Sequence, residues 1–127
     1  MEQKINILVV DDEEIMRNLF TDILRESGYE VTAVPNGMDA QEKASQGLFQ
    51  MAFVDVHMPI MNGIQTLRGL KEISPEISVV MMDSFPDVLT GAARKEDVFK
   101  CLHKPFNIEE VLNVVEDAVG CSESTTL

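Results

Sequence analysis

The sequence predicts an α/β domain built on a doubly wound, five-stranded parallel sheet. Five short apolar segments alternate along the chain with segments of helical periodicity. Most of the apolar segments are nearly continuous, as is typical of strands that are buried on both faces of a parallel sheet. Because strands that alternate with helices form right-handed crossovers, we expect helices on both faces of the sheet.

The five expected strands differ in how apolar they are. The second is short and alternates polar with apolar residues, whereas the fourth is the most apolar and is expected near the centre of the sheet. In chain order the strands are Ile5–Val10, Glu30–Val34, Gln50–Val54, Ile77–Met82 and Val98–Leu102.

Three of the five expected helices precede the fourth strand. Glu14–Ser27 has Ile15, Leu19, Ile23 and Leu24 on one face, and Gly28 ends it. Met38–Gln46 follows a turn at Pro35-Asn36-Gly37 and ends at Gly47. Ile64–Ile73 has an inward face of Ile64, Leu67, Leu70 and Lys71, and Ser74-Pro75 ends it.

The last two helices differ in the strength of their signal. Pro86–Lys95 is the weakest prediction, because Gly91 lies inside it. Ile108–Val119 is clear, with Asn107 as the N-cap. Its expected inward residues are Ile108, Val111, Leu112, Val115, Ala118 and Val119. We therefore assign residues 1–120 to one domain and residues 121–127 to a flexible C-terminal tail.

Composition excludes several functions. The chain has 127 residues and a net charge of −12, from 22 acidic and 10 basic residues, with no basic stripe for direct nucleic-acid binding. No apolar run approaches the ~20 residues of a membrane span, and no signal-peptide pattern is visible. We expect a cytoplasmic protein without a disulfide, in which Cys101 is a small buried hydrophobe.

Charged residues follow three of the strands. In the flavodoxin-like strand order 2-1-3-4-5, the carboxyl ends of strands one and three are neighbours, where ligands bind. Asp11 and Asp12 follow the first strand, Asp55 follows the third, and Lys104 follows the fifth. Three carboxylates repel one another unless a cation joins them, and oxygen ligands favour Mg²⁺. The lysine could hold an anion beside that ion, as a phosphorylated aspartate requires.

The chain resembles the receiver domain of two-component response regulators over roughly residues 4–120. The resemblance rests on four motifs that occur in the family's order and at similar spacing. They are Asp11-Asp12, Asp55-Val56-His57-Met58-Pro59-Ile60-Met61-Asn62-Gly63, Pro75, and Lys104-Pro105-Phe106.

The resemblance implies a role for each matching residue. Asp55 would accept a phosphoryl group from a histidine kinase or a histidine phosphotransfer protein, and Lys104 would pair with the phosphoryl oxygens. Asp12, Asp55 and the backbone carbonyl of His57 would bind Mg²⁺, with Asp11 acting mainly through a water. Only self-phosphotransfer and autodephosphorylation would be expected as activities. A downstream protein or a missing output domain would receive the signal, and a weak homodimer is compatible with this assignment.

Two positions depart from the family pattern. Asp83 takes the place of the Thr or Ser whose hydroxyl bonds the phosphoryl group, and Cys101 takes the place of an aromatic switch residue. A carboxylate repels a phosphoryl group and donates no hydrogen bond unless it is protonated. Ser84 could supply the hydroxyl instead. The side chain of His57 is expected in solvent.

Two alternatives remain open from the sequence. Asp83 and Cys101 favour a degenerate receiver that binds proteins without phosphorylation, whereas intact Asp11, Asp12, Asp55 and Lys104 favour phosphorylation. A Mg²⁺-dependent phosphatase with an aspartate nucleophile usually has a second acid two residues later, where this chain has His57.

Overall fold

The computed structural model describes residues 5–58, 60–83 and 98–123, without the side chains of 120–123. Its five strands form one parallel sheet in the order β2-β1-β3-β4-β5, which confirms the predicted order. The strands are β1 (Asn6–Val10), β2 (Glu30–Val34), β3 (Met51–Asp55), β4 (Ser78–Asp83) and β5 (Lys100–His103). Both Asp55 and Asp83 belong to their strands, so the sheet itself fixes their backbones.

Four helices are present in the described residues, α1 (Glu14–Glu26), α2 (Gly37–Gln46), α3 (Gly63–Ile73) and α5 (Ile108–Glu123). The fifth expected helix, Pro86–Lys95, lies outside the described residues. α5 continues through Gly120 to Glu123, so the expected end at Val119 is wrong. A glycine inside a helix costs only about 1 kcal/mol and does not have to end it. None of the helices in the described part of the chain is long and apolar enough to cross a membrane.

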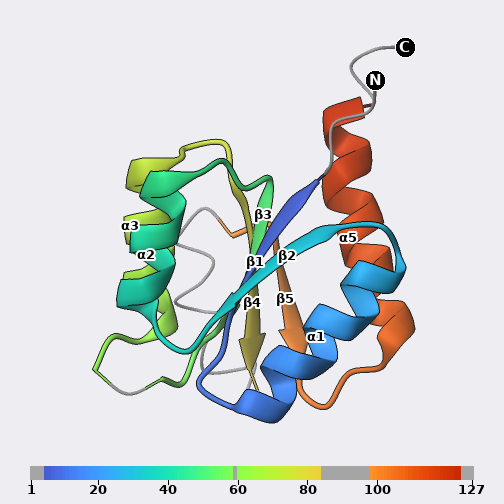
Figure 1. Cartoon of the computed structure of the whole chain (residues 1–127), viewed down its shortest axis with the longest axis horizontal. Coiled ribbons are helices and arrows are strands. Elements are labelled where there is room, and N and C mark those ends of the chain that lie inside the picture. The colour runs from blue at the N-terminus through green and yellow to red at the C-terminus, as the bar shows by residue number, and fades with distance from the viewer. Residues whose placement is uncertain (1–4, 59, 84–97, 124–127) are drawn as a thin grey trace.

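The sheet is covered on both faces (Figure 1). α1 and α5 cover one face, and α2 and α3 cover the other. The pleat of β1 shows how one strand serves both cores. Ile7 and Val9 pack toward α1 and α5, whereas Leu8 and Val10 pack toward α2 and α3. The strands are apolar at consecutive positions because both faces of the sheet are buried, as the sequence predicted.

The buried face of α1 differs from the expected one. Ile23 and Leu24 are buried as expected, but Ile15 is 80% exposed and Leu19 is exposed, while Phe20 is buried. The Phe20 ring lies 4.9 Å from the ring of Phe53, centroid to centroid. This aromatic contact with β3 fixes the rotation of the helix about its axis. Ile15 and Leu19 then face outward.

α5 shows a smaller difference of the same kind. Ile108 is exposed, and Val114, which was not expected inside, is buried with Val111, Val115 and Ala118. Asn107 caps the helix as expected, because its side-chain oxygen accepts a hydrogen bond from the Glu110 backbone N–H at 2.9 Å.

The loop after β3 is held at its far end by the start of α3. Asn62 and Gln65 form a capping box, and the Gly63 N–H donates to the Val56 carbonyl at 2.9 Å. A Cβ atom at Gly63 would lie 2.7 Å from the Asp55 carbonyl oxygen and 2.7 Å from the Val56 Cα. Only glycine lets α3 begin this close to the end of β3.

We expect Gly63→Ala to destabilise the fold by about 1–3 kcal/mol, because the added methyl group meets backbone atoms that cannot move aside cheaply. Gly47→Ala is the matched control, since a Cβ atom there has no neighbour within 4 Å. Urea unfolding of both variants checks this. Equal stability of the two variants would contradict the close approach of α3 to β3.

Candidate functional site

Three carboxylates meet at the carboxyl end of β1 and β3. Asp11 and Asp12 follow β1, and Asp55 is the last residue of β3, one position after Val54, which pairs with Val10. One oxygen atom from each of the three lies within 4.8 Å of the other two. Asp11 and Asp55 are buried and Asp12 is exposed, so this acidic pocket is open to solvent at one side.

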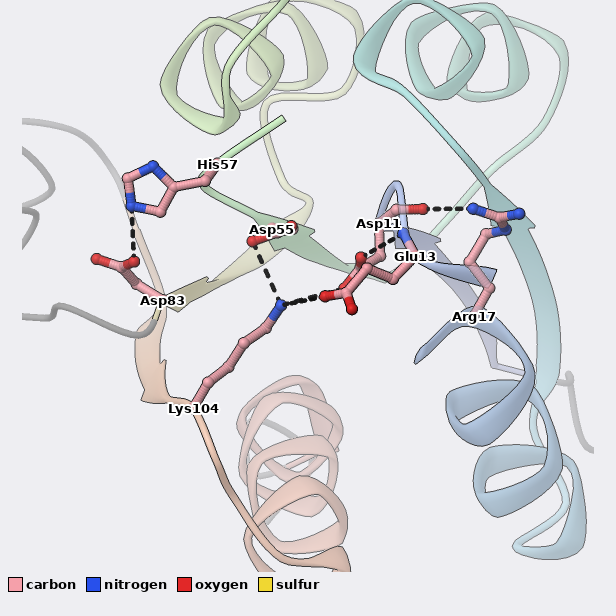
Figure 2. Close-up of polar contacts among 7 residues, drawn as sticks. All are labelled: Asp11, Glu13, Arg17, Asp55, His57, Asp83 and Lys104. Carbon is pink, nitrogen blue, oxygen red and sulfur yellow. Dashed lines mark hydrogen bonds and ion pairs between the residues drawn. The ribbon is translucent and has the colours of Figure 1, made fainter. Parts of the chain in front are cut away.

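Lys104 enters this pocket from the loop after β5 (Figure 2). Its Nζ lies 3.4 Å from Asp11 Oδ2 and 3.5 Å from Asp55 Oδ1. The Lys104 backbone N–H donates to the Asp83 carbonyl at 2.7 Å, which continues the β4–β5 pairing and aims the side chain at the pocket. The predicted set of Asp11, Asp12, Asp55 and Lys104 is therefore brought together.

Glu13 and Arg17 support the pocket and were missed by the sequence analysis. Arg17 Nη1 donates to the Asp11 carbonyl at 2.8 Å, and the Glu13 N–H donates to Asp11 Oδ1 at 2.9 Å. Glu13 Oε1 also lies 3.9 Å from Lys104 Nζ. The run of acids from Asp11 hinted at Glu13, but nothing in the sequence shows that the Arg17 side chain turns back to the loop.

The pocket is short of positive charge. Burial raises the pKa of Asp55 to about 6, although the nearby Lys104 ammonium opposes that rise. Burial likewise raises the pKa of Asp11. For Lys104, burial alone would lower the pKa, but the Asp11 and Asp55 carboxylates outweigh it and the pKa is raised. One ammonium thus faces three carboxylates.

The residues present fit a hard divalent cation. The pocket offers carboxylate oxygens from three residues at close range, one side is open, and the charge balance favours an added cation. Carboxylate and water ligands with no nitrogen or sulfur suit Mg²⁺. Among the described residues, no other three His, Cys, Asp or Glu side chains bring ligand atoms this close together.

Asp83 lies beside this pocket and is turned away from it. Figure 2 shows its carboxylate directed toward His57 rather than toward Lys104. Asp83 Oδ1 is 2.9 Å from His57 Nε2, but the pair lacks hydrogen-bond geometry, and both Asp83 oxygens are buried without a hydrogen-bond partner. The His57 side chain is 64% exposed, so its solvent contact was expected and its contact with Asp83 was not.

Cys101 is exposed, so the expectation of a buried hydrophobe is wrong. β5 is an edge strand in which only Leu102 is buried, and the thiol lies on the other face of that strand. Ser84, the alternative hydroxyl donor, lies outside the described residues. Asp83 is turned away from the acidic pocket and Cys101 is exposed. Neither of the two residues that depart from the family pattern thus places its side chain with Asp55 and Lys104 in the pocket.

An apolar cavity of about 350 Å³ adjoins Lys104. Its lining comes from α1 and from the loop between β5 and α5, and consists of Met16, Leu19, Lys104, Pro105 and Phe106. Leu19, which lines this cavity, and Ile15 on the same helix are both exposed. The acidic pocket thus has an apolar surface on the Lys104 side.

Without divalent cations, we expect the free energy of unfolding to fall as pH rises from about 4 to about 7. The folded protein holds the Asp55 proton up to about pH 6, whereas the ordinary value is 3.8. The folded state therefore binds more protons in this window and loses stability as pH rises. Asp55→Asn should stabilise the protein at pH 7 by on the order of 1–2 kcal/mol, since water reaches one side of the pocket.

Urea unfolding in a chelator at several pH values measures this effect. Glu116→Gln, an exposed acid on α5, is the control and should change neither the stability nor its slope with pH. If Asp55→Asn and the native protein are equally stable at pH 7, the charge on Asp55 does not lower the free energy of unfolding.

Comparison with known proteins agrees with this geometry. The sequence profile of the response regulator receiver domain matches residues 7–116. The receiver protein CpdR of Brucella abortus is 32% identical over 111 residues, which cover 87% of this chain and 92% of CpdR. The transcriptional regulatory protein ZraR of Klebsiella oxytoca is 31% identical over 119 residues, covering 93% of this chain and 27% of ZraR.

The chain thus spans about a quarter of the length of ZraR and related regulators. Among solved structures, the chemotaxis protein CheY4 of Vibrio cholerae superposes with a TM-score of 0.85 at 26% identity, covering 91% of this chain and 99% of that one. With its five-stranded parallel sheet and its acidic pocket, the chain belongs to the response regulator receiver domain family of two-component signalling.

Proposed function

We propose that this receiver domain accepts a phosphoryl group on Asp55 from a phosphohistidine. The observation that carries the proposal is the position of the Asp55 carboxylate, which ends β3 among Asp11, Asp12 and Lys104, 3.5 Å from the lysine Nζ. Family membership supports a phosphodonor such as a histidine kinase or a histidine phosphotransfer protein.

The reaction forms an O–P bond from an Asp55 oxygen and breaks the N–P bond of the phosphohistidine. The electron pair of the broken bond stays on the imidazole nitrogen, which takes a proton from water. Asp55 must be ionised to act, and with a pKa of about 6 it is mostly ionised at pH 7. Lys104 is placed to hold the charge of the transferred phosphoryl oxygens.

Mg²⁺ held by Asp12, Asp55 and the backbone carbonyl of His57, with Asp11 through a water, would supply charge neutralisation during transfer. The hydrogen bond from the Arg17 guanidinium to the Asp11 carbonyl keeps the loop that carries Asp11 and Asp12 in place. The remaining work of the protein is to orient the Asp55 oxygens and to keep Lys104 beside them.

The apolar cavity beside Lys104 supports a protein as the phosphodonor. A donor histidine has to come within bonding distance of Asp55, so the donor must touch the surface around the pocket. There the cavity and the exposed Ile15 and Leu19 offer an apolar area. A protein partner with apolar side chains near its histidine would gain from burying this area.

A phosphorylation-independent binding module remains the second candidate. Asp83 in place of a hydroxyl and the exposed thiol of Cys101 favour it, because neither can serve the usual response to the phosphoryl group. The same features make us propose an atypical output switch if phosphorylation occurs. The output itself would pass to a downstream protein or to an output domain elsewhere in a longer chain.

We expect Asp55→Asn to abolish labelling by acetyl phosphate in the presence of Mg²⁺, because the amide cannot attack phosphorus. Asp117→Asn, an exposed acid on α5, should be labelled as well as the native protein. Intact-protein mass spectrometry detects the phosphoryl group. Persistent labelling of Asp55→Asn would remove the assignment, and no labelling of the native protein would favour the binding module.

We expect Asp83→Thr to raise the phosphorylated fraction at fixed acetyl phosphate and Mg²⁺. Asp83 follows Met82, which pairs with Asp55 in the sheet, and its carboxylate would repel a phosphoryl group on Asp55, so relief of that repulsion should be measurable. Asp83→Val, which removes the charge without adding a hydroxyl, separates charge from hydrogen bonding. Equal phosphorylation levels and decay rates in all three proteins would make Asp83 a bystander.

A further inference from the structure

His57 lies between two carboxylates that end different strands. The Val56 N–H donates to the Met82 carbonyl at 3.0 Å, so the β3–β4 pairing continues one residue beyond Asp55. His57 therefore begins its loop beside Asp83, the residue after Met82. Burial raises the pKa of Asp55, and a hydrogen bond from the His57 backbone N–H opposes that rise. The backbone of His57 thus serves Asp55, while its side chain faces Asp83.

The Asp83 carboxylate is buried and short of partners. It is 4% exposed, and neither oxygen has a hydrogen-bond partner. Burying a polar group without a partner is costly, and more so when the group is charged. His57 Nε2 lies 2.9 Å from Asp83 Oδ1 at the end of a side chain that is 64% exposed. A small rotation of this imidazole would align its N–H with the carboxylate oxygen, so the contact favours the direction in which Asp83 points.

That direction leads away from the acidic pocket. Figure 2 shows the Asp83 carboxylate directed toward the imidazole, and the Lys104 side chain directed toward Asp11 and Asp55. The backbones of Asp83 and Lys104 are nevertheless adjacent, because the Lys104 N–H donates to the Asp83 carbonyl at 2.7 Å. A rotation of the Asp83 side chain would therefore turn its carboxylate toward the Lys104 ammonium, which already faces three acids.

We propose that His57 is a positioning residue that draws the Asp83 carboxylate away from the acidic pocket and leaves Lys104 to Asp55. This role rests on the proposed function, in which Lys104 holds the phosphoryl oxygens. Without the imidazole, the Asp83 carboxylate gains by turning to the ammonium, since an unpaired buried charge is costly. It then adds negative charge beside Asp55 and opposes phosphoryl transfer. The repulsion that remains with His57 in place is the part that Asp83→Thr relieves.

The first measurement is the rate of labelling by acetyl phosphate at saturating Mg²⁺. His57→Ala should slow labelling by about threefold or more, since residues in contact commonly couple to this extent or beyond. His57→Gln keeps a side-chain N–H donor and should recover most of the lost rate. In an Asp83→Val background no carboxylate is left to release, so His57→Ala should have no further effect. Thermal melts of each variant verify folding.

The second measurement is the Mg²⁺ affinity, determined by calorimetric titration without a phosphodonor. Alanine keeps the backbone carbonyl that the proposed Mg²⁺ site uses, and the released Asp83 adds a fourth carboxylate to the pocket. The affinity should rise by about threefold or more in His57→Ala, because the charge of the ligands tunes the affinity for a cation. In the Asp83→Val background it should not rise. A loop that was merely loosened would lower both the labelling rate and the affinity, so changes of opposite sign identify the positioning role.

Three results would overturn the proposal. They are an unchanged labelling rate in His57→Ala, an equal slowing by His57→Ala with and without the Asp83 carboxylate, and a lower or unchanged Mg²⁺ affinity in His57→Ala. No labelling of the native protein would instead remove the proposed function, and with it the role of His57 in phosphoryl transfer. The Mg²⁺ affinities would still decide whether His57 keeps the Asp83 carboxylate out of the pocket.

Discussion

The ion pairs of the Lys104 ammonium with the buried carboxylates of Asp11 and Asp55 are the contacts on which the rest of the site depends. They join residues from the ends of β1, β3 and β5, which are far apart in sequence. Burial raises the pKa of Asp55, and the single Lys104 ammonium opposes that rise only in part, so the pocket favours an added cation. The same shortage of positive charge would couple folding stability to cation binding and to the proposed phosphoryl transfer.

The sheet provides the rigidity that this imbalance requires. β1 and β3 are paired side by side, so Asp11 and Asp55 cannot move apart to relieve their repulsion without breaking strand pairing. Gly63 allows α3 to begin against the end of β3, and Arg17 holds the loop after β1. A charged, destabilising arrangement of this kind is expected at a functional site that the surrounding structure holds in place.

Asp83 is the residue at which this chain differs most from the pattern of its family. It ends β4 beside the acidic pocket, and its Oδ1 lies 2.9 Å from His57 Nε2. Any effect of Asp83 on the proposed phosphorylation follows from this one buried carboxylate, whose oxygens have no hydrogen-bond partner.

The sequence by itself determined the sheet order and the residues of the acidic pocket. Continuous apolar strands, helix-length spacers and acids at strand ends depend on local composition and on the crossover rule, which act without tertiary detail. Only the tertiary structure decided the rotation of α1, the exposure of Cys101 and the contact of His57 with Asp83. The ring of Phe20 against Phe53 turns Ile15 outward, and the edge position of β5 exposes its thiol. Such outcomes depend on which surfaces meet, and contacts between distant segments leave no periodic signal in the chain.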